Sequence, residues 1–408
     1  MKLTKTIKIK IGKLSRNKYN ILDIVLRKNT KAINFCLDKA KKGEIINHSL
    51  VYKDLRKYNL PATVIHGARA KSVEIIKSFY KRKGKSFPVL RNSRVRFDNV
   101  IIKLRHTNNK LYPEFISLLY KSRKNCNDNR IELPLILNSN YQKEIIKQIG
   151  SNFKLGSTEL VKYKGDFYVN ISYSKEVNLP IPNKSFSPVG VDIGINNLAV
   201  SVAQSSVKFH SGQRIKYKNK FFREQRAILQ QNGALKEIRR LKGRQSRYND
   251  FYRHNISKDI IKQAKLEKNP VLVLEKLKGI RNTSTVKKNY RAVLHNWIFR
   301  KQQQAIEYKA NWEGIPVIYV DSYHTSQICS KCGELNKRNH HSYKCSYCGF
   351  ECNSDYNGAK NIAKRFFSAI SQEEQASINY ASNSIKPEST KTEMDNIVRN
   401  LNGGHKLL

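Results

Sequence analysis

Alternating apolar and polar residues predict strands at the amino terminus and again after residue 95. Ile7, Ile9 and Ile11 alternate with polar residues, a pattern typical of a half-buried strand. From residue 95 to residue 177 the alternating runs are short, and Lys164-Gly165-Asp166 predicts a hairpin turn between two of them. We expect one antiparallel sheet or barrel to hold these runs and to include the first strand.

Helical spacing replaces alternation in two segments between these strands. Residues 18–42 and 61–82 carry apolar side chains three and four positions apart, with lysines and arginines elsewhere. We therefore expect packed helices with basic outer faces. Pro180, Pro182 and Pro188 then predict a linker and a domain boundary.

The segment after this linker predicts a hairpin that carries a lone carboxylate. Apolar residues at odd positions from 189 to 195 share one face, and Asp192 lies on the other face between Gly190 and Gly194. These glycines are expected to leave room for a phosphate or a metal ion beside Asp192. Asn196-Asn197 predicts the turn. Taken alone, the pattern also fits a hairpin with an exposed acid.

Further acids occur at the ends of later elements. Residues 271–274 form a continuous apolar run, typical of a strand buried on both faces, and Glu275 follows directly. Active groups gather at the carboxyl ends of such strands, although a charged residue there can also mark where a strand surfaces. A second buried strand, residues 317–320, ends at Asp321. Asp321 is therefore the alternative candidate for any role assigned to Glu275. Asp355 opens a later helix, where an acid is also common as a cap.

These elements follow the order of an RNase H-like nuclease: strand, strand, strand, helix, strand, helix. Residues 207–209 add the third strand, residues 216–248 a helical pair, and residues 290–313 a long amphipathic helix. Asp192, Glu275 and Asp355 would then share one site. Such a nuclease needs clustered carboxylates because it holds two Mg²⁺ ions about 3.5–4 Å apart.

Charge and length narrow the class of protein. The 408 residues, enough for two to four domains, carry a formal charge of +47. This charge favours a polyanionic partner, above all nucleic acid. No run approaches the about 20 apolar residues that span a bilayer, and the alternating amino terminus is unlike a signal peptide. We expect no membrane partner and a cytoplasmic, nucleoid-associated protein.

The helical pair at residues 216–248 carries many lysines and arginines. Only Glu224 and Glu237 offset these positive charges. The basic side chains therefore repel one another unless phosphates lie alongside the helices. A solvated basic face is the alternative. We predict nucleic-acid contacts from six arginines: Arg223, Arg226, Arg239, Arg240, Arg244 and Arg247.

Cysteine spacing predicts a metal site. Cys329-x-x-Cys332-Gly333 and Cys345-x-x-Cys348-Gly349 are two knuckles separated by twelve residues, a spacing typical of Zn²⁺ held by four thiolates, and the glycines permit the tight turns. Four thiolates leave no open position for chemistry, so this Zn²⁺ would be structural. Three alternative ligands break the paired spacing: Cys352, His340 and His341.

The ordered set of motifs resembles the TnpB (OrfB) family, which bacterial and archaeal insertion sequences encode and which is related to compact type V CRISPR effectors. The amino half agrees loosely, for example at Phe87-Pro88 and at Gly165-Asp166-Phe167-Tyr168. The carboxyl half carries the specific motifs: Gly190-Val-Asp192-Ile-Gly194, Leu274-Glu275-x-Leu277, Tyr308-Lys309-Ala310, Thr325-Ser326-Gln327, the two knuckles and Asp355-x-Asn357-x-Ala359-x-Asn361-Ile362.

The resemblance implies an α/β carboxyl half with a split RNase H-like (RuvC) domain at residues 188–324 and 353–370, and a zinc ribbon inserted at 325–352. It implies an α+β amino half, with an antiparallel wedge-type β-barrel at 1–16 and 95–182 and a helical recognition domain at 17–94. Residues 371–408 are polar, lack periodicity and carry little net charge, so we predict a disordered tail.

The resemblance further implies an RNA-guided DNA endonuclease with Asp192, Glu275 and Asp355 as catalytic, Mg²⁺-binding acids. Its partners would be a guide RNA transcribed from the element's own end and double-stranded DNA, cut beside a short target-adjacent motif. The ribbon would help to load this DNA. In such systems base pairing reads the sequence, and the protein reads backbone shape and the short motif.

Three other functions fit parts of the sequence. A nuclease-inactive, RNA-guided DNA-binding regulator would not need the intact acid triad, and a structural RNA-binding zinc-ribbon protein would not need an acid cluster. A compact type V CRISPR effector would share the chemistry and differ by a neighbouring repeat array. One departure from the family is Asn353-Ser354, where Asp-Arg or His-Arg often precedes the last acid; it bears on local substrate contacts.

Overall fold

The computed structural model describes residues 1–371 except 45, 47, 83, 85, 110, 122–128, 277–298 and 338–341. The chain forms two compact units, an amino unit of Lys2–Glu176 and a carboxyl unit that begins at Val177. Within the described part, no helix is long and apolar enough to cross a membrane.

A seven-stranded antiparallel sheet forms the base of the amino unit, in the order β2-β6-β7-β1-β5-β4-β3. As predicted, the first strand joins this sheet: it pairs with β7 along its length and with β5 at its end. Ile7, Ile9 and Ile11 are buried, because alternation directs every second side chain into the core. The strands are β1 (Lys2–Ile11), β2 (Val95–Phe97), β3 (Ile102–His106), β4 (Glu114–Leu119), β5 (Arg130–Ile136), β6 (Lys154–Tyr163) and β7 (Asp166–Glu176).

The two edge strands of this sheet are neighbours in sequence. Strand β2 ends at Phe97 and β3 begins at Ile102, with a 3-10 turn at Asn99–Ile101 between them. The five residue steps from Phe97 to Ile102 span at most about 17 Å. In a flat sheet, the six spacings from strand to strand would place β2 and β3 about 29 Å apart. The sheet must therefore curl. No pairing between β2 and β3 is present among the described residues, so a closed barrel stays a prediction.

Helices α1 (Arg16–Lys41) and α3 (Ala62–Lys81) match the two helices predicted from spacing, and they pack against each other. The α1 side chain of Asn29 donates to Ser93 Oγ over 2.8 Å and to the Arg94 carbonyl over 2.9 Å, so α1 is fastened to the segment that leads into β2. Two shorter helices, α2 (His48–Leu55) and α4 (Asn140–Gln148), and a 3-10 turn at Arg56–Tyr58 were not predicted.

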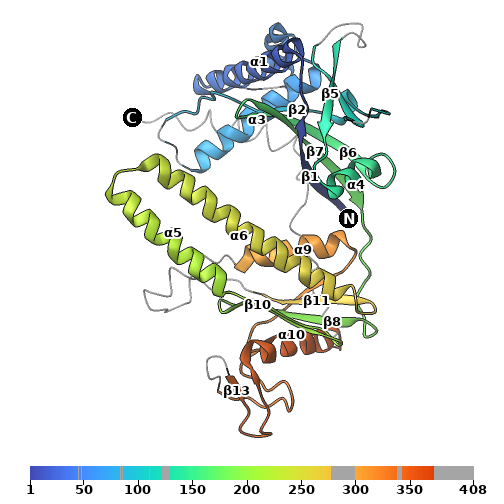
Figure 1. The fold of residues 1–408 in the computed structure, drawn as a ribbon, viewed down its shortest axis with the longest axis vertical. Helices are drawn as coiled ribbons and strands as arrows, with labels where there is room; N and C mark the ends of the chain where they lie inside the picture. Colours follow the sequence, from blue (N-terminus) through green and yellow to red (C-terminus); the bar gives the residue numbers. More distant parts are fainter. Residues whose placement is uncertain are drawn as a thin grey trace. The chain divides into compact units, whose positions relative to one another are not determined.

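A five-stranded sheet in the order β10-β9-β8-β11-β12 forms the centre of the carboxyl unit (Figure 1). Strands β8, β11 and β12 are parallel, and consecutive hairpins join β8 to β9 and β9 to β10, so that β9 alone runs against the other four strands of this sheet. Residues 193–196 connect β8 to β9, so the predicted turn includes Asn196, whereas Asn197 already begins β9. The strands are β8 (Ser187–Asp192), β9 (Asn197–Val202), β10 (Val207–Ser211), β11 (Pro270–Glu275) and β12 (Val317–Val320).

Helices cover both faces of this sheet. Odd-numbered β8 residues such as Val189 and Val191 pack with α6 (Leu235–Ala264) and α9 (Phe299–Trp312) in one apolar cluster. The other face of β11 and β12 packs against Ile362 and Phe366 of α10 (Ser354–Ser371). Figure 1 shows α6 and α9 on one side of the sheet and α10 on the other. The predicted element order is therefore present as a three-layer α/β/α unit.

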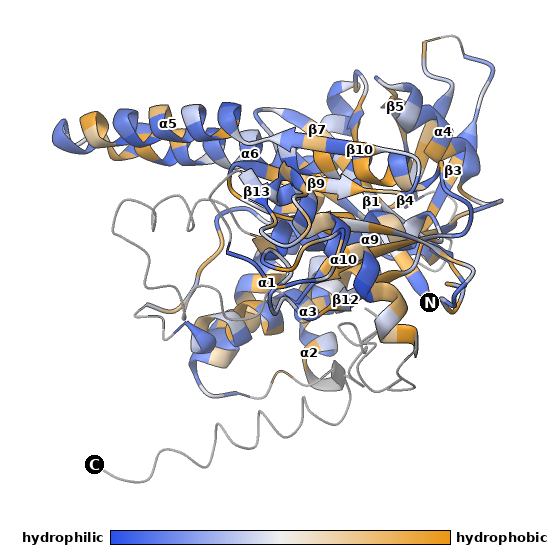
Figure 2. Cartoon of the chain, turned by 90° about the horizontal axis from the view of Figure 1, so that it is seen from below, coloured by the Kyte–Doolittle hydropathy of each residue, from blue (hydrophilic) through white to orange (hydrophobic). Residues whose placement is uncertain are grey.

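Helices α5 (Gln213–Gln231) and α6 form a long hairpin that extends beyond the sheet of its own unit (Figures 1 and 2). The buried residues of α5 end at Phe222, and those of α6 begin at Gln245. The 22 residues between them, 223–244, therefore contribute nothing to the core. Figure 2 shows this hairpin largely in blue, broken by short orange turns.

Some predicted segments fall partly outside the described residues. The helix expected at 290–313 is seen as α9 from Phe299, and its first part lies in 277–298. The motif residue Leu277, both alternative histidines and the tail predicted after residue 371 also lie outside. Two short strands, β13 (Ser342–Lys344) and β14 (Glu351–Asn353), pair antiparallel within the predicted ribbon.

Candidate functional site

Asp192 and Glu275 end two neighbouring parallel strands. The register pairs Leu274 with Val191, so the next positions, Glu275 and Asp192, lie side by side at the carboxyl edge. Paired residues of parallel strands point to the same face, and here it is the face that α10 covers, because Val271 and Val273 pack against α10. Both acids are half-buried.

Asp355 reaches the same place from the first turn of α10. The Asn353 side chain accepts the backbone N–H groups of Asp355 and Tyr356, at 2.9 and 3.3 Å, and so caps the helix. The Asn197 amide at the start of β9 donates to Asp355 Oδ2 over 2.8 Å. The three predicted acids thus converge on the beginning of α10.

The glycines beside Asp192 have a different role from the one expected. A Cβ at Gly190 would lie 2.1 Å from the Ala359 carbonyl oxygen and 2.6 Å from the Ala363 nitrogen, both in the α10 backbone. At Gly194, a Cβ would lie 2.8 Å from the Asn197 carbonyl oxygen. The prediction that these glycines leave room for a ligand was wrong, because α10 and the hairpin turn occupy that space.

A glycine on α10 instead adjoins the Asp192 carboxylate. A Cβ at Gly358 would lie 3.0 Å from Asp192 Oδ2. Since Gly358 lies one turn after Asp355, this contact places the Asp192 carboxylate directly against the first turns of the helix.

Several polar side chains surround the acids. The Thr325 hydroxyl donates to Glu275 Oε1, and the Gln303 amide donates to the Glu275 carbonyl over 2.7 Å. Lys216 of α5 donates to Asn196 Oδ1. Burial lowers the pKa of Lys216, and the negative charge of Asp355 partly opposes this shift, so a cation adjoins the acid site.

The rival acid, Asp321, has a different environment. Its carboxylate accepts the backbone N–H of Tyr323 over 3.2 Å, and its carbonyl accepts from Arg365 of α10. Asp321 is exposed and follows Val320, which faces α10, so strand alternation directs its side chain to the opposite face from Glu275.

The donor set suits Mg²⁺, which prefers oxygen ligands. Asp192, Glu275 and Asp355 would each offer carboxylate oxygens to such an ion.

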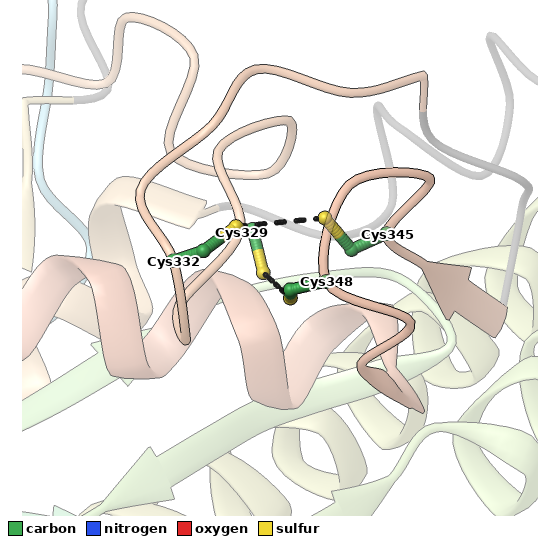
Figure 3. Close-up of side chains that lie close together, drawn as sticks. All are labelled: Cys329, Cys332, Cys345 and Cys348. Atoms are coloured by element: carbon green, nitrogen blue, oxygen red, sulfur yellow. Dashed lines mark hydrogen bonds between the residues drawn. The ribbon is translucent and has the colours of Figure 1, made fainter.

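Figure 3 shows the four predicted cysteines turned toward a common centre. The Sγ atoms of Cys329 and Cys348 lie 3.7 Å apart, and those of Cys332 and Cys345 lie 3.6 Å apart. A tetrahedron with Zn–S bonds of about 2.3 Å has edges of about 3.8 Å. The quartet therefore fits one Zn²⁺ ion and leaves no coordination position for substrate.

Both knuckles have the same backbone geometry. Gly333 donates to the Cys329 carbonyl over 2.9 Å, and Gly349 donates to the Cys345 carbonyl over 3.1 Å. Both glycines have positive φ, 89° and 66°, as the tight turn requires. The backbone N–H of Cys348 lowers the pKa of Cys345 to about 6. The second knuckle thus favours the thiolate form of Cys345, which is the form that binds metal.

Cys352 is not part of this quartet. It pairs with Tyr343 between β14 and β13, and burial raises the pKa of its thiol. Cys352 and the fully buried Tyr343 pack beside the knuckles as an apolar support.

The ribbon is fastened to the acid site by one face of α10. The Asn357 amide donates to the Ile328 carbonyl over 2.7 Å, and the Asn361 amide donates to the Thr325 and Ile328 carbonyls over 2.8 and 2.6 Å. Both asparagines are buried. Both lie in the motif that begins with Asp355, although no role was predicted for them; the available signal was two amides four residues apart, which share one face of a helix.

Of the six predicted arginines, all except Arg226 are exposed on the α5–α6 hairpin. Arg226 is half-buried and donates to the Phe222 carbonyl over 3.2 Å, and Arg240 pairs with Glu237 at 2.6 Å. Five of the six lie in residues 223–244, which contribute nothing to the core. Their position leaves them available for a partner.

The chain is similar to known proteins. A family model described as "Cas12f1-like, TNB domain" matches residues 299–362, from the start of α9 into α10. The chain is 31% identical over 241 residues to a TnpB-like protein of Methanocaldococcus jannaschii, which covers 56% of this chain and 84% of that protein. It is 30% identical over 219 residues to the CRISPR-associated endodeoxyribonuclease Cas12f1 of Sulfoacidibacillus thermotolerans. This match covers 49% of the chain and only 50% of the relative's length.

The fold also resembles a solved structure. The cryo-EM structure of a Cas12f1–sgRNA–target DNA complex contains a chain that matches with a TM-score of 0.60 and 16% identity, over 89% of this chain and 99% of that one. At this identity the likeness concerns the fold, and it extends over both units.

Proposed function

Because this chain belongs to the TnpB-like family, we propose that it is an RNA-guided DNA endonuclease, with Asp192, Glu275 and Asp355 as its catalytic acids. The convergence of these three carboxylates at the start of α10 is the observation that carries the proposal. The endodeoxyribonuclease activity named for the Cas12f1 relative supports it.

The acids would hold two Mg²⁺ ions, which activate water and stabilise the leaving oxygen of a phosphodiester. The side chains around them keep the carboxylates in place: Asn197 orients Asp355, and Thr325 orients Glu275. Lys216, beside Asp355, adds a positive charge at the edge where a phosphate would approach. The half-buried position of the acids limits the water that competes for them.

The proposed partners are a guide RNA, transcribed from the end of the mobile element, and double-stranded DNA that carries a short target-adjacent motif. A charge of +47 supports binding to both. The exposed arginines of the α5–α6 hairpin are proposed contacts, and the zinc ribbon is a proposed module for target DNA. The sgRNA–target DNA complex of the structural neighbour agrees with this pair of partners.

The domain assignment extends this proposal. Residues 188–324 and 353–370 would be the split RuvC domain, interrupted by the ribbon at 325–352. Residues 1–16 and 95–182 would be the wedge-type barrel, and residues 17–94 the recognition domain. The curled amino sheet and the α1–α3 pair support the last two assignments.

Co-purified RNA and cleavage of a plasmid library with randomised flanks test the function together. We expect one defined RNA and Mg²⁺-dependent cuts directed by its guide segment. Asp192→Ala and Glu275→Ala should abolish cleavage while the RNA still co-purifies, and Asp321→Ala should cut normally. Guide-directed binding without cuts by the wild type would identify a regulator instead, and a repeat array beside the gene would identify a CRISPR effector.

A further inference from the structure

The Thr325 hydroxyl connects the zinc ribbon to the acid site. Thr325 is 4% exposed, and its Oγ1 lies within hydrogen-bond distance of Glu275 Oε1 and, at 3.2 Å, of the Ser322 carbonyl. A hydroxyl has one proton, and hydrogen bonds to a charged acceptor are the stronger ones. The proton therefore belongs to the Glu275 carboxylate.

The backbone of Thr325 is fixed independently of its side chain. Asn361 donates to the carbonyls of Thr325 and Ile328, and Asn357 donates to Ile328 and accepts the N–H of Ser330 over 2.9 Å. Together these four hydrogen bonds hold residues 325–330 against α10. This segment runs directly into the first zinc knuckle.

Two of the acids are therefore held through the same helix. Asp355 and Asn357 lie in the first turn of α10, and Asn361 lies one turn after Asn357. Glu275 lies on a strand and reaches α10 through Thr325. A shift of residues 325–330 would move the Thr325 hydroxyl away from Glu275.

We propose that Thr325 is a positioning residue for Glu275, and that the ribbon segment 325–330, clamped by Asn357 and Asn361, sets the affinity of the acid site for divalent metal. This inference rests on the proposed function, because it assumes that Glu275 is a metal ligand. It gives the ribbon a second task beside DNA contact: its attachment to α10 fixes the geometry of the catalytic acids.

Thr325→Val keeps the shape of the side chain and removes the hydroxyl, whereas Thr325→Ser keeps the hydroxyl. Thr158→Val is a matched control, since Thr158 is fully buried in β6 and its hydroxyl has no hydrogen-bond partner in the described structure. The full-length variants are titrated with Mn²⁺ alone, without nucleic acid, and free Mn²⁺ is measured by electron paramagnetic resonance. Outer-shell substitutions typically weaken metal affinity about 10–100-fold.

We expect Thr325→Val to weaken Mn²⁺ binding by about 10–100-fold and to raise the Mg²⁺ concentration for half-maximal cleavage in parallel. Thr325→Ser should restore both, and Thr158→Val should change neither. Asn361→Ala should shift Mn²⁺ binding in the same direction, and its effect should not add fully to that of Thr325→Val, because both act on one segment.

Normal Mn²⁺ binding by Thr325→Val would overturn the inference, as would equal losses in Thr325→Val and Thr325→Ser, which would indicate packing. The result differs if the proposed nuclease function itself is wrong. In that case Asp192→Ala and Glu275→Ala bind Mn²⁺ as the wild type does, so no acid site exists for Thr325 to organise.

Discussion

The side-chain amide of Asn197 donates to Oδ2 of Asp355 over 2.8 Å, joining two residues that are 158 positions apart in sequence. One residue begins β9 and the other lies in the first turn of α10. This hydrogen bond uses one lone pair of Oδ2, and the remaining lone pairs of the carboxylate would serve the proposed metal site. It also fixes where α10 begins relative to the sheet.

Asn197→Ala should therefore reduce cleavage by about 10–100-fold, as outer-shell substitutions usually do. Asn197→Asp should be at least as damaging, because it replaces a donor with a negative charge facing Asp355. Cleavage rates measured over a range of Mg²⁺ concentrations test both variants. Wild-type rates and Mg²⁺ dependence in Asn197→Ala would show that Asp355 needs no such support.

Gly190→Ala should separate α10 from the sheet. The new methyl would lie 2.1 Å from the Ala359 carbonyl oxygen, which belongs to the backbone and cannot rotate away. We expect a loss of at least about 1–3 kcal/mol in the free energy of unfolding, measured by urea denaturation, together with loss of cleavage.

Gly243→Ala is the control for Gly190→Ala. Gly243 lies within α6, where the nearest atom to a new Cβ is the end of the Arg247 side chain at 3.4 Å. Alanine in a helix interior should stabilise the protein by about 0.5–1 kcal/mol. Equal effects at the two glycines would contradict the packing argument.

The hairpin arginines should contribute to binding through charge. Arg239→Ala and Arg244→Ala remove exposed cations from a segment outside the core, so nucleic-acid affinity should fall for all sequences alike. The slope of log affinity against log salt should become shallower by about 0.9 for each duplex phosphate that the variant no longer neutralises.

Glu237→Gln should have the opposite effect on binding, because it removes the carboxylate that pairs with Arg240 at 2.6 Å. Filter binding at several salt concentrations measures both sets of variants. An unchanged salt slope in the arginine variants would exclude the hairpin from the interface.

Because of Lys309, the free energy of unfolding should depend on pH in the alkaline range. Burial against α6 lowers its pKa to about 8, while its ammonium donates to Ser257 Oγ over 2.6 Å. Between about pH 8 and 10.5 the unfolded chain keeps a proton that the folded chain releases. The free energy of unfolding should therefore gain a contribution that rises with pH in this window.

Lys309→Met should remove this contribution, and Lys236→Met, at an exposed position of α6, should keep it. Urea denaturation of the three proteins at pH 8, 9 and 10 provides the comparison. A pH slope in Lys309→Met equal to that of the wild type would contradict the assignment.

Patterns of period two and of paired cysteines were enough to predict much of this structure. Alternation from residue 189 to 195 placed Asp192 on the correct face of β8, because a strand side chain has only two directions to take. The apolar run at 271–274 indicated a buried strand that ends at Glu275, as found. The two knuckles predicted the zinc quartet, since each supplies two thiolates to one tetrahedral ion.

Packing between distant segments could not be predicted in the same way. Nothing near Gly190 in sequence indicates that α10, about 170 positions later, fills the space beside it. Thr325 and Asn361 are likewise ordinary polar residues until the fold buries them against Glu275 and the ribbon. Their roles depend on tertiary packing, which local periodicity does not encode.

The position of α10 late in the chain has a consequence for biosynthesis. Val271, Val273, Ile318 and Val320 form one face of the sheet, and they are covered by Ile362 and Phe366. A ribosome adds about 5–20 residues per second. This apolar face is therefore exposed for several seconds before the residues of α10 that cover it have been synthesised. During that interval the exposed apolar face is open to aggregation, and the proposed acid site still lacks Asp355.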